Sequence, residues 1–194
     1  GIFKRKYSFL RKKYKLRKKV VLYLGQLNGA QYAQLVIKSY KQILIKRKDV
    51  SLLIVGGGSN LQDLKDFTKS QELEKDVVFT GFVHDDEVPK CIAAADVAVA
   101  SFEKNKITEC KSPLKIVEYL GSGKAIVASD VGEVKRMVGD SGFVVEPGNV
   151  EEITKKVMHL LDDEILRKQF EKNARIHAIK KFNWDITAKN ILDV

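Results

Sequence analysis

Short, largely apolar runs recur along this chain, and most of them end at or beside a glycine or another small residue. Six such runs predict β-strands, at residues 20–24, 51–55, 77–81, 96–100, 125–128 and 142–145. Apolar side chains at successive positions, without polar alternation, are typical of strands that are buried on both faces of a parallel sheet. The pattern therefore predicts a sheet that is covered by helices on both sides.

The segments between and after these runs have the period of an α-helix. Helices are predicted over 31–47, 60–73, 86–95, 112–123, 150–162, 164–181 and 184–193. Strands that alternate with helices indicate βαβ units, and right-handed crossovers then place helices on both faces. We predict an α/β fold, a Rossmann-like three-layer sandwich around a six-stranded parallel sheet.

The segment Thr108–Gly123 is the most informative part of the chain. Ser112 is expected as the N-cap of a helix, and Pro113 suits the first helical position because its missing N–H needs no partner there. A lysine in the first turn, Lys115, is disfavoured by the helix dipole unless an anion binds at the helix N-terminus. Glu118 could then accept hydrogen bonds from sugar hydroxyls. The plain alternative is a surface helix with an ordinary cap.

Glycine-rich turns follow the predicted strands, and they belong to the same edge of the sheet. The turns are Gly25-Gln26, Gly56-Gly57-Gly58, Gly81-Phe82-Val83 and the loop that leads into Ser112. Ligands of doubly wound sheets bind outside the carboxyl ends of the strands. We therefore expect one binding site at this edge.

Charge is distributed unevenly along the chain. Residues 1–19 hold ten of the 35 Lys and Arg residues and no Asp or Glu, so the remaining 25 basic residues match the 25 acidic ones. Because residues 20–194 carry no excess positive charge, the sequence argues against a nucleic-acid-binding fold. Within the first 19 residues, an apolar helical face is predicted for Phe3, Tyr7, Leu10 and Tyr14. This pattern is typical of a basic amphipathic helix at a membrane surface; the alternative is that these side chains dock on a neighbouring domain.

Several other classes of protein are disfavoured by what the sequence lacks. Two cysteines, Cys91 and Cys110, indicate a reducing compartment rather than a disulfide scaffold, and three scattered histidines argue against a zinc site. No apolar run is long enough for a membrane span or a signal peptide. The glycine fingerprint of dinucleotide redox domains and the P-loop lysine motif are also missing.

Taken together, the motifs resemble the C-terminal, donor-binding domain of a GT-B glycosyltransferase of family 4, the retaining group 1 type. The similar segments, in chain order, are Val21–Tyr40, Leu53–Gly58, Val78–Val83, Ala95–Ser101, Ser112–Gly123, Ala128–Gly132 and Gly142–Gly148. Each motif is modest, but their shared order along nearly the whole chain is specific.

The resemblance implies a nucleotide-sugar donor, UDP- or GDP-linked, and a glycan or lipid-linked acceptor. It implies that Glu118 binds the ribose, that Lys115 and the amides near Pro113 and Leu114 face the diphosphate, and that the Gly81–Val83 backbone lies against the base. No metal or cofactor is expected. Lys115 and Glu118 are the predicted catalytic residues. The predicted donor-binding set is Gly25, Gln26, Gln31, Gly57, Phe82, Val83, Ser112, Pro113, Leu114, Lys115 and Glu118.

Three positions depart from the family pattern. Cys110 stands where a glutamate is usual, eight residues before the ribose-binding one, and Gln26 and Gln31 stand where Arg and Lys are usual. Glutamine can donate a hydrogen bond but supplies no charge to a phosphate site. Two alternatives therefore stay open: a degenerate, non-catalytic GT-B module for partner assembly, and a GT-B enzyme of the sugar-nucleotide epimerase kind.

The resemblance covers only one of the two domains that form a GT-B active site. We expect residues 1–19 to be a basic amphipathic arm or interdomain linker and residues 20–194 to be the nucleotide-sugar-binding domain, with the N-terminal acceptor domain absent from this chain. The expected location is the cytoplasm, with the arm as a candidate contact to an anionic membrane at its inner face. No nucleic-acid partner is expected.

Overall fold

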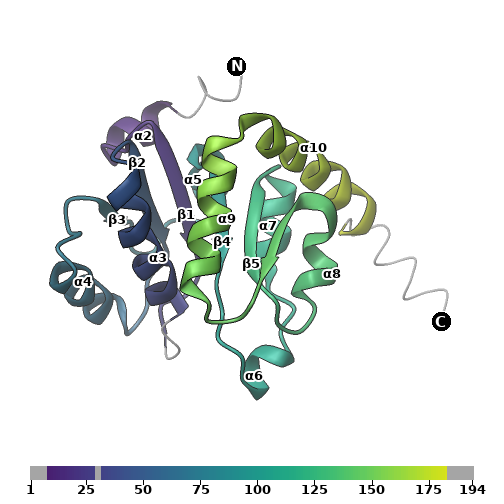
Figure 1. Cartoon of the computed structure of the whole chain (residues 1–194), viewed down its shortest axis with the longest axis horizontal. Coiled ribbons are helices and arrows are strands. Elements are labelled where there is room, and N and C mark those ends of the chain that lie inside the picture. The colour runs from purple at the N-terminus through teal and green to yellow at the C-terminus, as the bar shows by residue number, and fades with distance from the viewer. Residues whose placement is uncertain (1–7, 29–31, 183–194) are drawn as a thin grey trace.

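A single six-stranded sheet, parallel throughout, forms the centre of the computed structural model, which describes residues 8–28 and 32–182 (Figure 1). The strands are β1 (Lys19–Leu24), β2 (Val50–Val55), β3 (Val77–Phe79), β4 (Val97–Ala100), β5 (Ala125–Ser129) and β6 (Gly142–Val145). Their order is β3-β2-β1-β4-β5-β6, so the direction of winding reverses between β1 and β4. The predicted α/β Rossmann-like fold with six parallel strands is confirmed.

Helices cover both faces of this sheet. They are α2 (Ser8–Lys13), α3 (Tyr32–Lys46), α4 (Leu61–Ser70), α5 (Val88–Ala94), α6 (Lys106–Glu109), α7 (Leu114–Gly121), α8 (Val134–Val138), α9 (Val150–Asp162) and α10 (Glu164–Lys181), with a 3₁₀ turn at Gly139–Ser141. In Figure 1, α3 and α9 lie in front of the sheet, and α5 and α7 lie behind it. The helix predicted over 184–193 lies outside the described residues. None of the helices in the described part of the chain is long and apolar enough to cross a bilayer.

The strands separate two hydrophobic cores. In β1, Val21 and Tyr23 point into the core beneath α3, α4 and α9, whereas Val20, Leu22 and Leu24 point into the core beneath α5, α7 and α8. All six residues of β1 and all six of β2 are buried. Burial on both faces explains why these strands appear in the sequence as continuous apolar runs.

The third strand is shorter than predicted. It ends at Phe79 rather than Gly81, because Gly81 forms a single antiparallel bridge with Gly56. Two short helices, α6 and α8, were not predicted, since four or five residues are too few to show a helical period.

Helix α2 packs on the body of the protein at the amino ends of the strands. Leu10 is 5 % exposed and Tyr14 is half-buried, and both contact the core that contains α5 and α7. The Arg11 guanidinium donates to the carbonyl oxygen of Ala94 and to the Asp96 carboxylate, just before β4. At Leu10 the predicted apolar face is therefore part of the core rather than free. Phe3 and Tyr7 lie outside the described residues.

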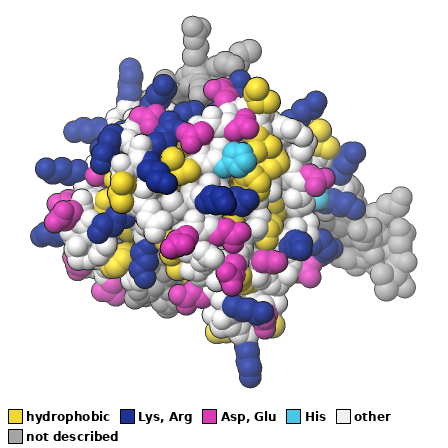
Figure 2. Space-filling model, viewed as in Figure 1, with side chains coloured by type: hydrophobic (Ala, Val, Ile, Leu, Met, Phe, Trp, Pro, Cys, Tyr) yellow, Lys and Arg dark blue, Asp and Glu magenta, His cyan; other side chains and the backbone are white. Residues whose placement is uncertain are grey.

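Basic and acidic side chains are interspersed over the face of the body that Figure 2 shows. The pattern agrees with the balance of charge in residues 20–194.

Candidate functional site

A cleft of about 870 Å³ opens at the carboxyl ends of the strands. Its walls come from the loops after β1, β2, β3 and β4 and from the first turns of α7. It is lined by every described residue of the predicted donor-binding set, namely Gly25, Gln26, Gly57, Phe82, Val83, Ser112, Pro113, Leu114, Lys115 and Glu118. Gln31 lies outside the described residues. The structure therefore brings the predicted residues together, although their roles stay predictions.

Helix α7 starts one residue later than the sequence predicts. Pro113, not Ser112, is the N-cap residue, because its ψ of 116° is extended and its carbonyl oxygen accepts the first bond of the helix, from Ile116 N–H at 3.0 Å. The Ser112 hydroxyl instead lies 3.5 Å from the Met137 sulfur. The amides of Leu114 and Lys115 are thus at the start of the helix, where no intrahelical partner is available to them.

The hydroxyl group of Tyr119 fixes α7 against the sheet. It accepts a hydrogen bond from Leu24 N–H at 2.9 Å and donates to the Val99 carbonyl oxygen at 3.2 Å, so that it joins α7 to β1 and β4. Tyr119 is fully buried. The first turn of α7 therefore has a defined position beside the cleft.

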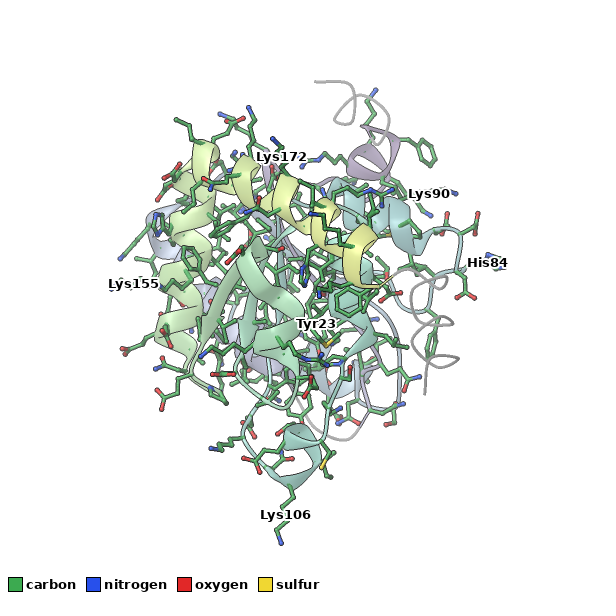
Figure 3. The ribbon with its side chains drawn as sticks, turned by 90° about the vertical axis from the view of Figure 1, so that its right-hand side faces the viewer. Tyr23, His84, Lys90, Lys106, Lys155 and Lys172 are labelled. Atoms are coloured by element: carbon green, nitrogen blue, oxygen red, sulfur yellow. The ribbon has the colours of Figure 1, made fainter. Side chains whose placement is uncertain are left out.

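Lys115 extends from that first turn across the end of β1. Its Nζ lies 4.2 Å from the centre of the Tyr23 ring and 5.5 Å from that of Phe102, within the range of cation–π attraction. Tyr23 is buried at the base of the cleft, near the middle of the molecule in Figure 3. A Cβ at Gly25 would come within 2.7 Å of Nζ, and φ there is +153°, so glycine provides the space that the lysine occupies.

The surroundings of Lys115 lower its pKa to about 7. Burial is the largest cause, the positive charge of Lys111 adds to it, and the Glu118 carboxylate opposes it. Desolvation raises the pKa of Glu118; the Lys115 charge opposes this shift, and Asp85 makes a smaller contribution that raises the pKa further. The cleft therefore holds a cation that loses its proton near neutral pH.

The opposite wall of the cleft is formed by Phe82 and the glycine turn after β2. The Phe82 ring is 76 % exposed, and a Cβ at Gly57 would lie 2.7 Å from it. Asn28, in the loop after β1, supports this wall, since its Oδ1 accepts a hydrogen bond from Ser59 N–H at 2.7 Å. An open aromatic ring above a glycine backbone is suited to a planar, stacking ligand.

Several residues of the cleft were missed by the sequence analysis. They are Tyr23, Asn28, Tyr32, Asp85, Phe102 and Lys111. Tyr23 belongs to an apolar run and was assigned to the core, although its place near the carboxyl end of β1 could have indicated the cleft. Lys111 carried a usable signal, because it immediately precedes the Ser112-Pro113 pair. In the described part of the chain, no group of three or more His, Cys, Asp or Glu residues is arranged to hold a metal ion.

Comparison with known proteins gives matches over nearly the whole chain. A family model described as "Glycosyl transferases group 1" matches residues 7–177. An uncharacterized glycosyltransferase of Methanocaldococcus jannaschii is 29 % identical over 180 residues, which are 91 % of this chain and 44 % of that protein. N-acetyl-alpha-D-glucosaminyl L-malate synthase of Bacillus anthracis is 24 % identical over 93 % of this chain and 46 % of its own length. The chain thus spans about half the length of these relatives.

Solved structures with the same fold include a chain of about twice this length and a chain that is a single C-terminal domain. Anabaena HepE, in complex with UDP and glucose, superposes with a TM-score of 0.84 at 22 % identity, over 97 % of this chain and 51 % of its own. The C-terminal domain of LpcC, a group 1 glycosyl transferase from Francisella tularensis, gives a TM-score of 0.77 at 23 % identity, over 93 % of both chains. These structures share the fold, and the family match covers most of the sequence. This chain belongs to the group 1 glycosyl transferases.

Proposed function

We propose that this chain is the donor-binding half of a retaining, metal-independent glycosyltransferase, which moves a sugar from a UDP- or GDP-sugar to a glycan or lipid-linked acceptor. The observation that carries the proposal is the position of Lys115 and Glu118 on one short helix, beside unpartnered helix-start amides, at the carboxyl edge of the sheet. A diphosphate at this point would face the helix dipole and one ammonium group.

Each wall of the cleft has its own part in this proposal. The Leu114 and Lys115 amides and the Lys115 ammonium bind the diphosphate and stabilise the charge that develops on it as the sugar leaves. Glu118, one turn further along α7, accepts hydrogen bonds from the ribose hydroxyls. The Phe82 ring and the backbone near Val83 lie against the base. The helix dipole and Lys115 together offset phosphate charge, which is why we propose a reaction without a metal ion.

The acceptor belongs to a second domain in this proposal. Relatives of about twice this length support a two-domain enzyme with the transfer at a cleft between the halves. The degenerate, non-catalytic alternative rests on neutral Gln26 in the cleft, on Gln31, which lies outside the described residues, and on Cys110, which does not line the cleft. The epimerase alternative predicts turnover of a nucleotide sugar without any acceptor.

Calorimetric titration of the chain with UDP, GDP and ADP tests the donor site. We expect one of the first two to bind, and Glu118→Ala to weaken that binding about ten- to hundredfold, which is the size of a charged hydrogen bond. Glu151→Ala, which removes an exposed carboxylate of α9, is the matched control and should leave the affinity unchanged. If the wild type, Glu118→Ala and Glu151→Ala bind the nucleotide with equal affinity, Glu118 is not part of the site.

The outer face of α2 supports a proposal about location. Phe9 is 72 % exposed, and Lys12 and Lys13, three and four residues later, are exposed on the same side of the helix. We propose that this face contacts an anionic membrane at the cytoplasmic side. Because Arg11 binds the segment before β4, the contact would lie at the amino edge of the sheet and would leave the cleft at the opposite edge open.

A further inference from the structure

Two lysine side chains from different segments meet in the cleft at one aromatic ring. Lys111 Nζ lies 5.8 Å from the centre of the Phe102 ring, and Lys115 Nζ lies 5.5 Å from the same centre. Lys111 Nζ is also 5.8 Å from the centre of the Tyr32 ring. Both lysines line the cleft.

The backbone of Lys111 is held in place by the chain around it. Lys111 N–H donates to the Thr108 carbonyl oxygen at 3.1 Å, and the Lys111 carbonyl oxygen accepts from Glu133 N–H at 3.1 Å. A Cβ at Gly132, where φ is +49°, would come within 2.4 Å of that carbonyl oxygen. Only glycine therefore permits the loop before α8 to approach Lys111 this closely.

The loop that carries Lys111 is also ordered from its other side. Asn105 caps α6 by accepting hydrogen bonds from Ile107 N–H and Thr108 N–H, and the Thr108 hydroxyl donates to the Glu103 carbonyl oxygen at 2.7 Å. These bonds span the turn between β4 and Lys111. The lysine thus starts from a defined backbone rather than from a loose surface loop.

Among the residues that the structure describes, neither lysine has a carboxylate within ion-pair distance, although the more distant Glu118 partly offsets the charge of Lys115. Across residues 8–28 and 32–182, neither ammonium forms an ion pair, whereas Lys90, Lys104 and Lys168 each lie beside a carboxylate. Two cations at one partly enclosed site repel each other. The repulsion is relieved when a ligand places one negatively charged phosphate group beside each of them.

We propose that Lys111 is a second phosphate-binding cation, which acts with Lys115 and the start of α7 to select a nucleoside diphosphate over a monophosphate. The inference rests on the proposed function of the cleft and deepens it, by assigning a specificity-determining residue to the donor site. It also locates the charge that neutral Gln26 does not supply: the second cation comes from the α7 side of the cleft, not from the loop after β1.

The test compares UDP with UMP, and GDP with GMP, on the 194-residue chain and its Lys111→Gln variant. We expect the variant to lose about tenfold or more in affinity for the diphosphate, since a charged contact is removed, and to lose little for the monophosphate. Lys111→Arg should restore diphosphate binding. Lys106→Gln, which removes the solvent-facing α6 lysine labelled in Figure 3, is the matched control and should bind both ligands as the wild type does.

The pH dependence of binding separates a direct role from a structural one. Lys115 faces Lys111, Glu118 and Tyr23, and the Lys111 charge contributes to its lowered pKa. Removing that charge raises the pKa of Lys115, so in Lys111→Gln the decline of diphosphate binding with rising pH should move to higher pH. A variant that merely distorts the loop would bind less at every pH, with an unchanged profile.

The results of these titrations distinguish a failure of the inference about Lys111 from a failure of the proposed donor site. If Lys111→Gln binds diphosphate and monophosphate like the wild type, or weakens both equally with an unchanged pH profile, the inference about Lys111 is wrong. If Glu118→Ala still weakens binding in that case, the donor site stands without Lys111. If the wild-type chain binds none of the four nucleotides, both proposals fall.

Discussion

The ammonium group of Lys115 lies over the ring of Tyr23, 4.2 Å from its centre, at the point where β1 ends in Gly25. The lysine belongs to α7 and the tyrosine to β1, so the contact joins two elements that are more than 90 residues apart in the chain. The ring face attracts the cation, but burial and the charge of Lys111 oppose its protonation. The cleft thus contains a cation whose charge depends on pH in the neutral range.

Diphosphate binding should weaken as pH rises through about 7, the pKa of Lys115 in the free protein. Above that pH the Lys115 side chain is a neutral amine, which must gain a proton before it can pair with the ligand. In Lys115→Arg this decline should disappear, because a guanidinium keeps its charge. Titrations between pH 6 and 8.5 check both statements, and parallel pH profiles in the two proteins would contradict them.

Lys115→Met should stabilise the free protein while it weakens the bound state. A lowered pKa means that the unfolded chain holds more protons than the folded one, so stability falls as pH decreases from about 10.4 towards 7. Methionine removes this charge but keeps an apolar stem over Tyr23. Thermal unfolding at pH 6 should give a higher melting temperature than the wild type, and a lower one would show that the charged lysine supports the fold.

Gln26→Arg should tighten diphosphate binding, because Gln26 lines the cleft at the end of β1 and carries no charge. A new ion pair between the arginine and a phosphate contributes about 1.5–3 kcal/mol, which corresponds to an affinity about tenfold higher or more. Gln26→Met, without charge, is the control. The Gln31→Lys change can be added, although this position lies outside the described residues. Unchanged affinity in the double variant would favour the non-catalytic alternative.

Arg11→Ala should destabilise the whole domain, although Arg11 lies far from the cleft. Its guanidinium is bonded to the Ala94 carbonyl oxygen at 2.7 Å and to Asp96, whose side chain is 4 % exposed. Loss of a partner for a buried carboxylate should lower the free energy of unfolding by about 2–4 kcal/mol. Urea unfolding measures this effect. As a control, Lys12→Ala at the exposed neighbouring position should change the free energy of unfolding by less than about 0.5 kcal/mol.

The chain should sediment with anionic vesicles and not with neutral ones if the outer face of α2 contacts a membrane. Phe9→Ser combined with Lys12→Gln and Lys13→Gln should reduce this binding, since each lysine near an anionic surface contributes about 1 kcal/mol. A control with Lys65→Gln and Lys69→Gln removes the same charge from α4. Equal losses in both variants would mean that net charge, not α2, determines binding. Added salt should weaken the contact.

The sheet was predictable because strands that are buried on both faces consist of continuous apolar residues, which the sequence shows directly. All six strands were predicted, and β6 and both long C-terminal helices, α9 and α10, have the predicted bounds. The details that failed depend on neighbours in space. Residue 81 is drawn away from β3 by its bridge to Gly56, and α7 starts late because Pro113 takes an extended ψ that no local pattern reveals.

The site was predictable where glycine turns and a helix start mark the carboxyl edge of the sheet. Lys111 was missed because its role depends on where the loop after α6 meets Gly132, a contact between two loops. Tyr23 was missed because a residue of a buried strand can still line a cleft at the end of that strand. Sequence patterns report burial along one element, and these two residues depend on packing between elements.

The hydroxyl of Tyr119, bonded to both β1 and β4, has a consequence for motion in this domain. Helix α7 cannot slide along the sheet without breaking two buried hydrogen bonds at Leu24 and Val99. Lys115 and Glu118 therefore move as one unit, with spacing set by a single rigid helix turn. Any closure around a ligand must come from the facing wall, where the Phe82 ring is exposed to solvent. In this domain the phosphate end would be the stationary half of the cleft, and the aromatic end the half that adapts.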